Sequence, residues 1–409
     1  MRTSPKSLLA SLMACVAITT GCSLLDSGET PHEPAINIDG DLPAALLAEP
    51  LWHATSDPSA PVIVTSLGIL TLHPNDERLL VPTLLGTDDG QPRWVGLGVQ
   101  PGDQHALAWV EQAGQSWAVL AVTRDTKVTV YAWRGAAGGY NTSPTSTTEL
   151  AGDEKAPTVT LGDAGVLLTG VTGKGPMSLW LDTGETTEAV IGKGSQAIQA
   201  LNDGWLLQHK DNLGYSYFSA GSSWESKDQA PKGAKPDSGA VLASGAGYLL
   251  TTWTATDGKK PILALVRALD GVVLAAGPAD PPDDVGKPLS SGATVVWGET
   301  VFNTATGEVK PIDLNGGTPE ALVDQLLYIT GAQEPLPVPV VAAGQGATPT
   351  VSMSPAAQVD GFTGNVTMDM ETFIPGPGNP SLHVVGVSAI GQAIVRDASG
   401  ENVYSVPRR

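Results

Sequence analysis

The chain has 409 residues, and its 42 acidic and 22 basic side chains give it a net charge of −20. Such a surface repels phosphate backbones and anionic headgroups, which argues against nucleic acid as a partner. Since 41% of the residues are hydrophobic, the composition is not that of a disordered chain, and its length allows one large β domain or two smaller ones.

Residues 1–21 have the features of an export signal. Arg2 and Lys6 precede the uncharged run "SLLASLMACVAITT", which is too short to span a bilayer, since spanning requires about 20 apolar residues. The run ends in "TTGC", which resembles the lipobox of bacterial lipoproteins, although Thr19 stands where that family usually has Leu, Val or Ile. The resemblance implies that residues 1–21 are removed and that Cys22 carries the lipid, including palmitate. The protein would then be anchored to the cell membrane on its extracytoplasmic side.

The alternative is an ordinary secretory signal peptide, which would leave Cys22 as a free thiol. The only other cysteine, Cys15, lies within the segment to be removed, so the mature chain has no disulfide, cysteine-based zinc site or iron–sulfur centre. No later segment has 18 consecutive apolar residues. Residues 22–50 are rich in acid, Pro and Gly, which predicts a tether between the lipid and a domain over 51–409.

Residues 51–409 predict an all-β domain, because short runs of Val, Leu, Thr, Trp and Tyr alternate with Gly, Asp, Pro and Ser. In "DAGVLLTG", "NDGWLLQH", "GAGYLLTT" and "SGATVVWG", equivalent glycines recur at intervals of about 40 to 45 residues. They are Gly165, Gly204, Gly247 and Gly292. This period, with several strands per unit, predicts a β-propeller of about seven four-stranded blades, with six to eight possible.

Two segments of the domain raise more specific questions. We expect the apolar stretch Pro61 to Leu72 to share one blade with the strand-rich C-terminus, because a propeller must join its ends or leave open strand edges. In "TPEALVDQLLYITG", Thr318 could cap a helix that starts at Pro319, but the same residues also fit strands.

Two resemblances concern the fold alone. The turns in "LWLDTGETTEAV", "FNTATGEV" and "VRDASGENVYSV" resemble the D-x-x-T-G-E turn between the last two strands of blades in quinoprotein-like bacterial propellers. The enzyme activity is not implied, because we find neither tryptophan docking motifs in successive blades nor a calcium site beside a quinone. The stretch Tyr217 to Trp224 is similar to the Asp-box of sialidase-type propellers, in which the box is a structural hairpin; here only Gly221 and Trp224 match.

The sequence carries no recognisable catalytic motif. The histidines have no i, i+4 pair and are expected at the surface or in loops; they are His32, His53, His73, His105, His209 and His383. "GKGSQA" and "GVSAIG" lack the spacing of a nucleophile elbow, and no glycine-rich phosphate loop occurs. Acidic clusters could supply calcium ligands but more simply form solvated turns; they are Asp39 and Asp41, Asp88 and Asp89, and Asp280, Asp283 and Asp284. Five tryptophans are expected in the core between blades: Trp109, Trp180, Trp205, Trp253 and Trp297.

Two functions of different classes fit this sequence. The first is a non-catalytic envelope module, without a cofactor, that binds a protein, peptide or glycan. The second is a propeller-type enzyme such as a glycan hydrolase or lyase. Carboxylates and a His or Tyr from different blades, meeting at one mouth of the channel, would favour the enzyme. A channel lined by Gly, Ala and Val would favour binding.

Overall fold

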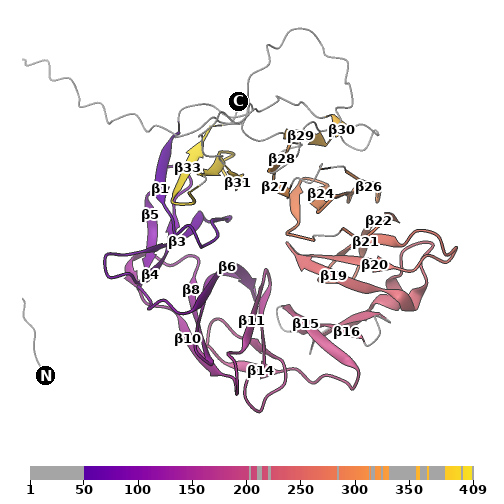
Figure 1. Ribbon diagram of the computed structural model, residues 1–409, viewed down its shortest axis with the longest axis horizontal. Coiled ribbons are helices and arrows are strands. Elements are labelled where there is room, and N and C mark those ends of the chain that lie inside the picture. Colours follow the sequence, from indigo (N-terminus) through magenta and orange to yellow (C-terminus); the bar gives the residue numbers. More distant parts are fainter. Residues whose placement is uncertain are drawn as a thin grey trace, which may run out of the picture. The chain divides into compact units, whose positions relative to one another are not determined.

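β-strands make up almost all of the regular structure in the computed structural model (Figure 1). The structure describes residues 50–201, 204–209, 214–219, 223–282, 285–312, 314, 318–323, 326–330, 356–359, 366–367, 383–397 and 399–407, all within one unit of residues 36–409. The helical elements in these ranges are two 3₁₀ turns, η2 (Ser226–Gln229) and η3 (Pro236–Ser238). The predicted signal peptide, Cys22 and nearly all of the tether lie outside the described residues and stay predictions.

The described strands form eight sheets, each of which is one blade. Blade 1 contains β2 (Ile63–Val64), β3 (Ile69–Pro74), β4 (Leu80–Leu85), β5 (Pro92–Gly96) and β9 (Gly139–Thr142). Blade 2 contains β6 (Gln104–Gln112), β7 (Gln115–Arg124), β8 (Lys127–Arg134) and β10 (Ser146–Ala151). Blade 3 contains β11 (Thr158–Gly162), β12 (Gly165–Thr169), β13 (Met177–Leu179) and β14 (Thr186–Glu188). Blade 4 contains β15 (Ser195–Leu201), β16 (Gly204–His209), β17 (Tyr215–Ser219) and β18 (Ser223–Glu225).

The other four blades complete the ring. Blade 5 contains β19 (Ala240–Gly245), β20 (Tyr248–Trp253), β21 (Ile262–Arg267) and β22 (Val273–Pro278). Blade 6 contains β23 (Leu289–Ser291), β24 (Thr294–Trp297), β25 (Thr300–Asn303) and β26 (Val309–Pro311). Blade 7 contains β27 (Thr318–Val323), β28 (Leu326–Thr330), β29 (Ala356–Val359) and β30 (Val366–Thr367). Blade 8 contains β31 (His383–Val387), β32 (Ala393–Arg396), β33 (Asn402–Val406) and β1 (Trp52–Thr55).

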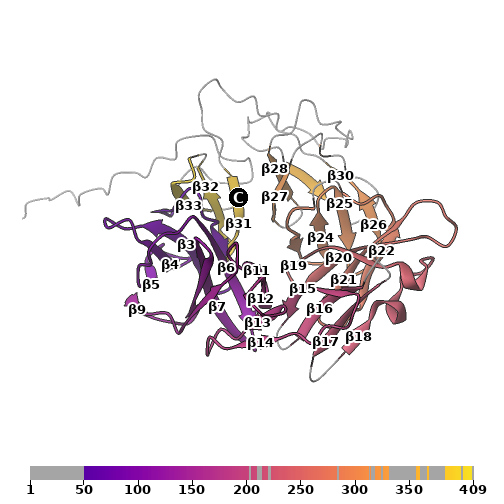
Figure 2. The ribbon, with the colours of Figure 1, turned by 60° about the horizontal axis from the view of Figure 1, so that its bottom comes forward.

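The predicted all-β propeller is confirmed. Seven of the described sheets have four strands, and blade 1 has a fifth strand, β9, which pairs parallel to β5 (Figure 2). The total of eight lies at the upper end of the predicted range. The first strands of several neighbouring blades contact each other: β6 contacts β11, β23 contacts β27, and β31 contacts both β27 and β2. The inner edges of these strands therefore surround the axis of the ring.

The ring closes through blade 8, where the N-terminal strand β1 pairs with β33. The expectation that the two ends share one blade is confirmed, but the segment named for it was wrong. Ile63–Val64 and Ile69–Pro74 are the first two strands of blade 1. The long apolar run around residues 61–72 reflects burial between blades, whereas β1 is a short strand at an outer edge with alternating burial.

The repeat seen in the sequence corresponds to one turn of each blade. Gly165 and Gly204 begin second strands, Gly247 directly precedes β20, and Gly292 lies two residues before β24. The D-x-x-T-G-E-like turns place Gly184 and Gly307 between third and fourth strands, at φ 75° and 78°. Gly400, at φ 75°, instead lies between the second and third strands of blade 8, because the fourth strand of that blade comes from the N-terminus.

Tryptophan rings cover two of the turn glycines. A Cβ on Gly90 of blade 1 would lie 2.5 Å from the ring of Trp52 on the outer strand of blade 8. A Cβ on Gly271 of blade 5 would lie 2.7 Å from the ring of Trp224 on the outer strand of blade 4. Docking of this kind was not found in the sequence. We call the contact between two consecutive blades a seam. One docked ring lies at the seam between blades 8 and 1, and the other lies at the seam between blades 4 and 5.

Apolar clusters fill six of the seams between consecutive blades. Of the tryptophans expected there, Trp205, Trp253 and Trp297 are buried, while Trp109 and Trp180 are half-buried. Tyr217 and Trp224 of the Asp-box-like stretch are stacked partners across the hairpin of β17 and β18. The segment from Thr318 forms β27 and β28, which decides the helix-or-strand question in favour of strands.

Candidate functional site

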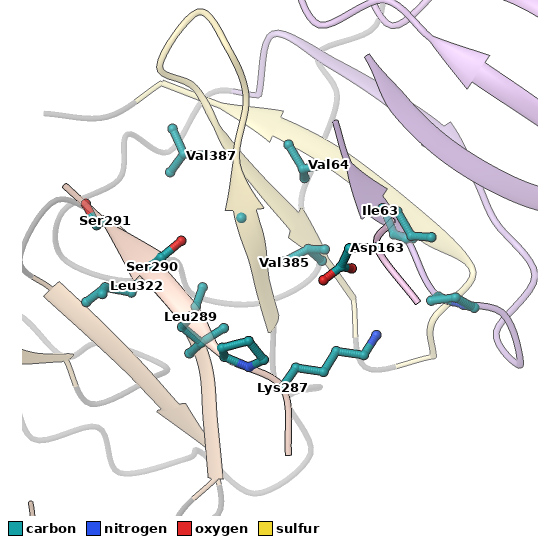
Figure 3. Close-up of a pocket in the computed structure, with 15 residues that line it drawn as sticks. Ile63, Val64, Asp163, Lys287, Leu289, Ser290, Ser291, Leu322, Val385 and Val387 are labelled. Atoms are coloured by element: carbon teal, nitrogen blue, oxygen red, sulfur yellow. The ribbon is translucent and has the colours of Figure 1, made fainter. Parts of the chain in front are cut away.

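A cavity of about 550 Å³ lies where the inner strands of several blades meet the axis (Figure 3). Its wall consists of segments from β2, β23, β27 and β31, with adjoining residues and one residue of blade 3. The lining residues are Pro61, Val62, Ile63, Val64, Asp163, Lys287, Pro288, Leu289, Ser290, Ser291, Ala321, Leu322, Val385, Gly386 and Val387. The volume lies in the range of pockets that hold small ligands.

Most of the residues in this wall are aliphatic, and some of them belong to the core between blades. Val62 is buried, and Val64 and Val385 pack against the same apolar cluster, which joins blades 8 and 1. Ala321 of β27 is also buried. Because these residues pack into the core, this part of the wall is fixed by the fold.

Two charged residues of opposite sign lie on the wall. Asp163 is exposed on the turn between β11 and β12, and its backbone carbonyl accepts a hydrogen bond from the Glu111 amide at 2.7 Å. Lys287 is exposed and precedes β23. Figure 3 shows both side chains as sticks beside the aliphatic residues. Neither has an ion-pair partner among the described residues, so both are available to a ligand.

Next to the cavity on the same two strands, Glu320 of β27 meets His383 of β31. Nδ1 of His383 donates a hydrogen bond to Oε1 of Glu320 at 2.5 Å. This bond raises the pKa of His383 above its ordinary value, against the opposing effects of burial and of the positive charge of Arg396. The other carboxylate oxygen, Oε2, is buried without a hydrogen-bond partner. The pair joins blades 7 and 8 and does not line the cavity.

A second histidine pair occurs in blade 4. Oγ of Ser195 lies 2.9 Å from Nδ1 of His209, and the two residues are directly opposite each other on β15 and β16. Ser195 belongs to "GKGSQA", which lacks a nucleophile elbow. A cross-strand hydrogen bond explains this contact fully, because no third group that would orient the imidazole is bonded to it within the described ranges.

The remaining sequence candidates are dispersed. Five histidines lie in strands rather than loops, namely His53, His73, His105, His209 and His383, while His32 lies outside the described residues. Asp88 and Asp89 belong to a turn, where Asp89 accepts a hydrogen bond from the Gln91 amide, and Asp280 pairs with Lys260 at 3.0 Å. No group of three or more His, Cys, Asp or Glu suited to a metal occurs in the described part of the chain.

Sequence reasoning missed the two charges on the cavity wall. Asp163 lies in the repeat unit "DAGVLL" and was interpreted only as a turn residue, and Lys287 belongs to no motif. Nothing in the local sequence of either residue indicates that blades 3 and 6 bring them to one cavity. Among the described residues, no helix has the length and apolar character needed to cross a membrane.

The fold and the site therefore define an eight-bladed β-propeller, as counted over the described residues, with an axial cavity of aliphatic wall and two opposite charges. No family model matches the chain, and no curated protein matches it. Among solved structures, BamB from Moraxella catarrhalis is 13% identical with a TM-score of 0.44, covering 88% of this chain and 97% of BamB. The dihydro-heme d1 dehydrogenase NirN is 15% identical with a TM-score of 0.37, over 90% of this chain and 78% of NirN. AztD from Citrobacter koseri is 12% identical with a TM-score of 0.33, over 68% of this chain and 88% of AztD.

Proposed function

We propose that this protein is a lipid-anchored component of the cell envelope whose extracytoplasmic propeller binds a protein, peptide or glycan without chemistry, with the axial cavity as the ligand site. The composition of the cavity wall carries this proposal. Its side chains are mostly aliphatic, and Asp163 is the one carboxylate among the described residues that line it. A glycan hydrolase would require a second carboxylate there, and Lys287, the other charged side chain among the described lining residues, does not supply one.

The Glu320–His383 pair is the observation that comes nearest to the enzyme alternative, because it joins a carboxylate and a histidine from different blades. It supplies a single carboxylate, however, and its free oxygen is buried. A glycan hydrolase needs two carboxylates on either side of the scissile bond. The pair therefore supports a structural role more than a catalytic one.

We expect the full-length chain, purified in detergent, to show no turnover of glycosides, esters, peptides or quinone-linked alcohols, with or without calcium. Product formation would be followed by chromatography against a heat-inactivated sample. Reproducible turnover that disappears in Glu320→Gln or Asp163→Asn would instead promote the enzyme alternative.

Binding through the cavity is tested by capture from envelope extract. Ser290 lies exposed on β23 at the cavity wall, so Ser290→Trp should obstruct the cavity and strongly reduce capture of the ligand. Ser223 is exposed on the outer strand β18, and Ser223→Trp is the matched control that should leave capture unchanged. Capture that survives Ser290→Trp, in a variant with unchanged thermal unfolding, would contradict the cavity as the ligand site.

The anchor is proposed to be the lipid on Cys22, which rests on the sequence alone. Radiolabelled palmitate should label the wild-type chain in its source bacterium, and Cys22→Ser should lose both the label and membrane retention. The reason is that two or three acyl chains make attachment stable, since each buried CH₂ contributes about 0.8 kcal/mol. Unchanged labelling and retention in the variant would require another anchor.

A further inference from the structure

The cavity is walled by strand edges as well as by side chains. β2, β23, β27 and β31 are the first strands of their blades, and each pairs only with the second strand of its blade in the described part of the sheet. No backbone hydrogen bond joins the opposite edges of these strands to another described segment. In an antiparallel pair, alternate residues direct their N–H and C=O groups away from the partner strand. The wall therefore offers backbone donors and acceptors together with aliphatic side chains.

A ligand that satisfies such edges must carry its own regularly spaced donors and acceptors. An extended peptide does so, because it can add to a free strand edge through main-chain hydrogen bonds. Its aliphatic side chains would contact those of the wall, such as Leu289, Leu322 and Val387. A sugar ring would instead be expected to stack on an aromatic side chain, and none is among the described residues that line the cavity.

The charges select among peptides. Asp163 offers an acceptor for an ammonium group, and Lys287 offers a donor for a carboxylate on a long, flexible stem. A Cβ on Gly245 would lie 4.0 Å from Oδ2 of Asp163 and 2.8 Å from Cδ of Pro288, so the carboxylate lies near the segment that carries Lys287. The net charge of −20 disfavours a polyanionic ligand in general. A ligand with one positive and one negative charge matches the two charged residues of the site, and it is not repelled as a polyanion would be by the protein's net negative charge.

We propose that the axial cavity binds a short, extended, aliphatic peptide with a free amino group and a free carboxylate. This inference rests on the proposed function and names its ligand class. The peptide backbone pairs with the inner strand edges, the ammonium group contacts Asp163, and the carboxylate contacts Lys287.

The test is calorimetric titration of the full-length chain in detergent with the dipeptide alanyl-valine, both termini free, because Asp163 lies near the segment that carries Lys287 and a longer extended peptide would hold its termini too far apart. Asp163→Asn should weaken its binding about tenfold, as expected for one charge-assisted hydrogen bond. The same variant should bind the N-acetylated peptide as the wild type does. Lys287→Gln should show the reciprocal pattern, with about tenfold weaker binding of the free carboxylate and no effect on the amidated peptide.

The controls separate this inference from the proposed function. Absence of dipeptide binding, or equal binding of the dipeptide with both termini blocked, would overturn the peptide inference. Either result would leave the proposed function standing if capture from envelope extract still depended on Ser290. Asp163 and Lys287 are both exposed, so these variants are expected to fold, and their thermal unfolding would be compared with that of the wild type.

Discussion

At the turn between the third and fourth strands, Gly90 meets two requirements. Its φ is 66°, a region that disfavours other residues, and the ring of Trp52 occupies the space where a Cβ would stand. Gly247 has a similar φ of 77° with open space around it. Comparing substitutions at Gly90 and Gly247 therefore distinguishes the cost of backbone strain from the cost of losing the contact between blades.

We expect Gly247→Ala to lower the free energy of unfolding by about 1 kcal/mol, the cost of the left-handed backbone alone. Gly90→Ala should lower it by about 3 kcal/mol, because Trp52 must also move and its hydrogen bond from Nε1 to the Thr87 carbonyl is disturbed. Urea unfolding followed by tryptophan fluorescence measures both changes. Equal losses in the two variants would show that the docked ring contributes nothing.

Residue roles were predictable from sequence where the reason is local. The turn glycines and the buried Trp253 and Trp297 follow from spacing and apolar neighbours. The docking of Trp52 on Gly90 was not predictable, because the two residues belong to different blades and only the closed ring brings them together. The same limit applies to Asp163 and Lys287.

Among the elements, four inner strands share a local irregularity. The register with the second strand shifts by one residue in each of them, three residue pairs before the turn in β15, β19 and β27 and two pairs before it in β31. The bulged residues are Ile198, Leu242, Glu320 and Val385. The three aliphatic ones pack into the apolar clusters that join their blade to the next. Glu320 stands in the same position and reaches the next blade through His383 instead.

Because Glu320 stands where the other bulges have an aliphatic residue, we expect the stability of the seam between blades 7 and 8 to depend on pH. Because Glu320 raises the pKa of His383 above its ordinary value, the pair contributes stability that is fully present below that ordinary pKa. The contribution is lost as the pH rises through the folded-state pKa. Arg396, opposite His383 on β32, opposes the shift. The difference in thermal midpoint between the wild type and His383→Gln should therefore be largest in mildly acidic buffer and should shrink in alkaline buffer.

A further variant tests the reason for this dependence. Glu320→Leu, which places at this bulge the type of residue found at the other three, should remove the pH-dependent difference caused by His383→Gln. A difference that kept its pH trend in the Glu320→Leu background would contradict the assignment to this seam.

Element type at this seam could not be decided from sequence, because "TPEALVDQLL" has both a helix-start pattern and strand-forming residues. The structure forms β27 and β28 there because the inner position of the blade requires a strand that pairs with its neighbour. Pairing with the neighbouring strand overrides the local helix preference. The sequence alone therefore left helix and strand as two open alternatives.

At the scale of the whole molecule, the ring is held by contacts between residues far apart in the chain. Leu51 and Ser56 donate backbone hydrogen bonds to the carbonyls of Ser405 and Glu401, both at 2.8 Å. Arg396 donates from Nη2 to the Asp57 carbonyl at 2.6 Å. The repeat predicted a ring and the need to close it, but β1 is only four residues long and carries no apolar run, so its role could not be recognised.

Ending the chain at Leu382 removes β31, β32 and β33 and leaves β1 without a partner. It also exposes the inner strand of blade 7 on one side of the ring and the first strand of blade 1 on the other. Because an open propeller has unpaired edges and loses two seams, we expect the truncated chain to lack a cooperative thermal transition and to aggregate. Calorimetry of the truncated and full-length chains measures this difference.

A chain that begins at Pro50 keeps all eight described sheets and should unfold at the same temperature as the full-length protein. If the chain ending at Leu382 also unfolded at that temperature, closure through blade 8 would not be what stabilises the ring.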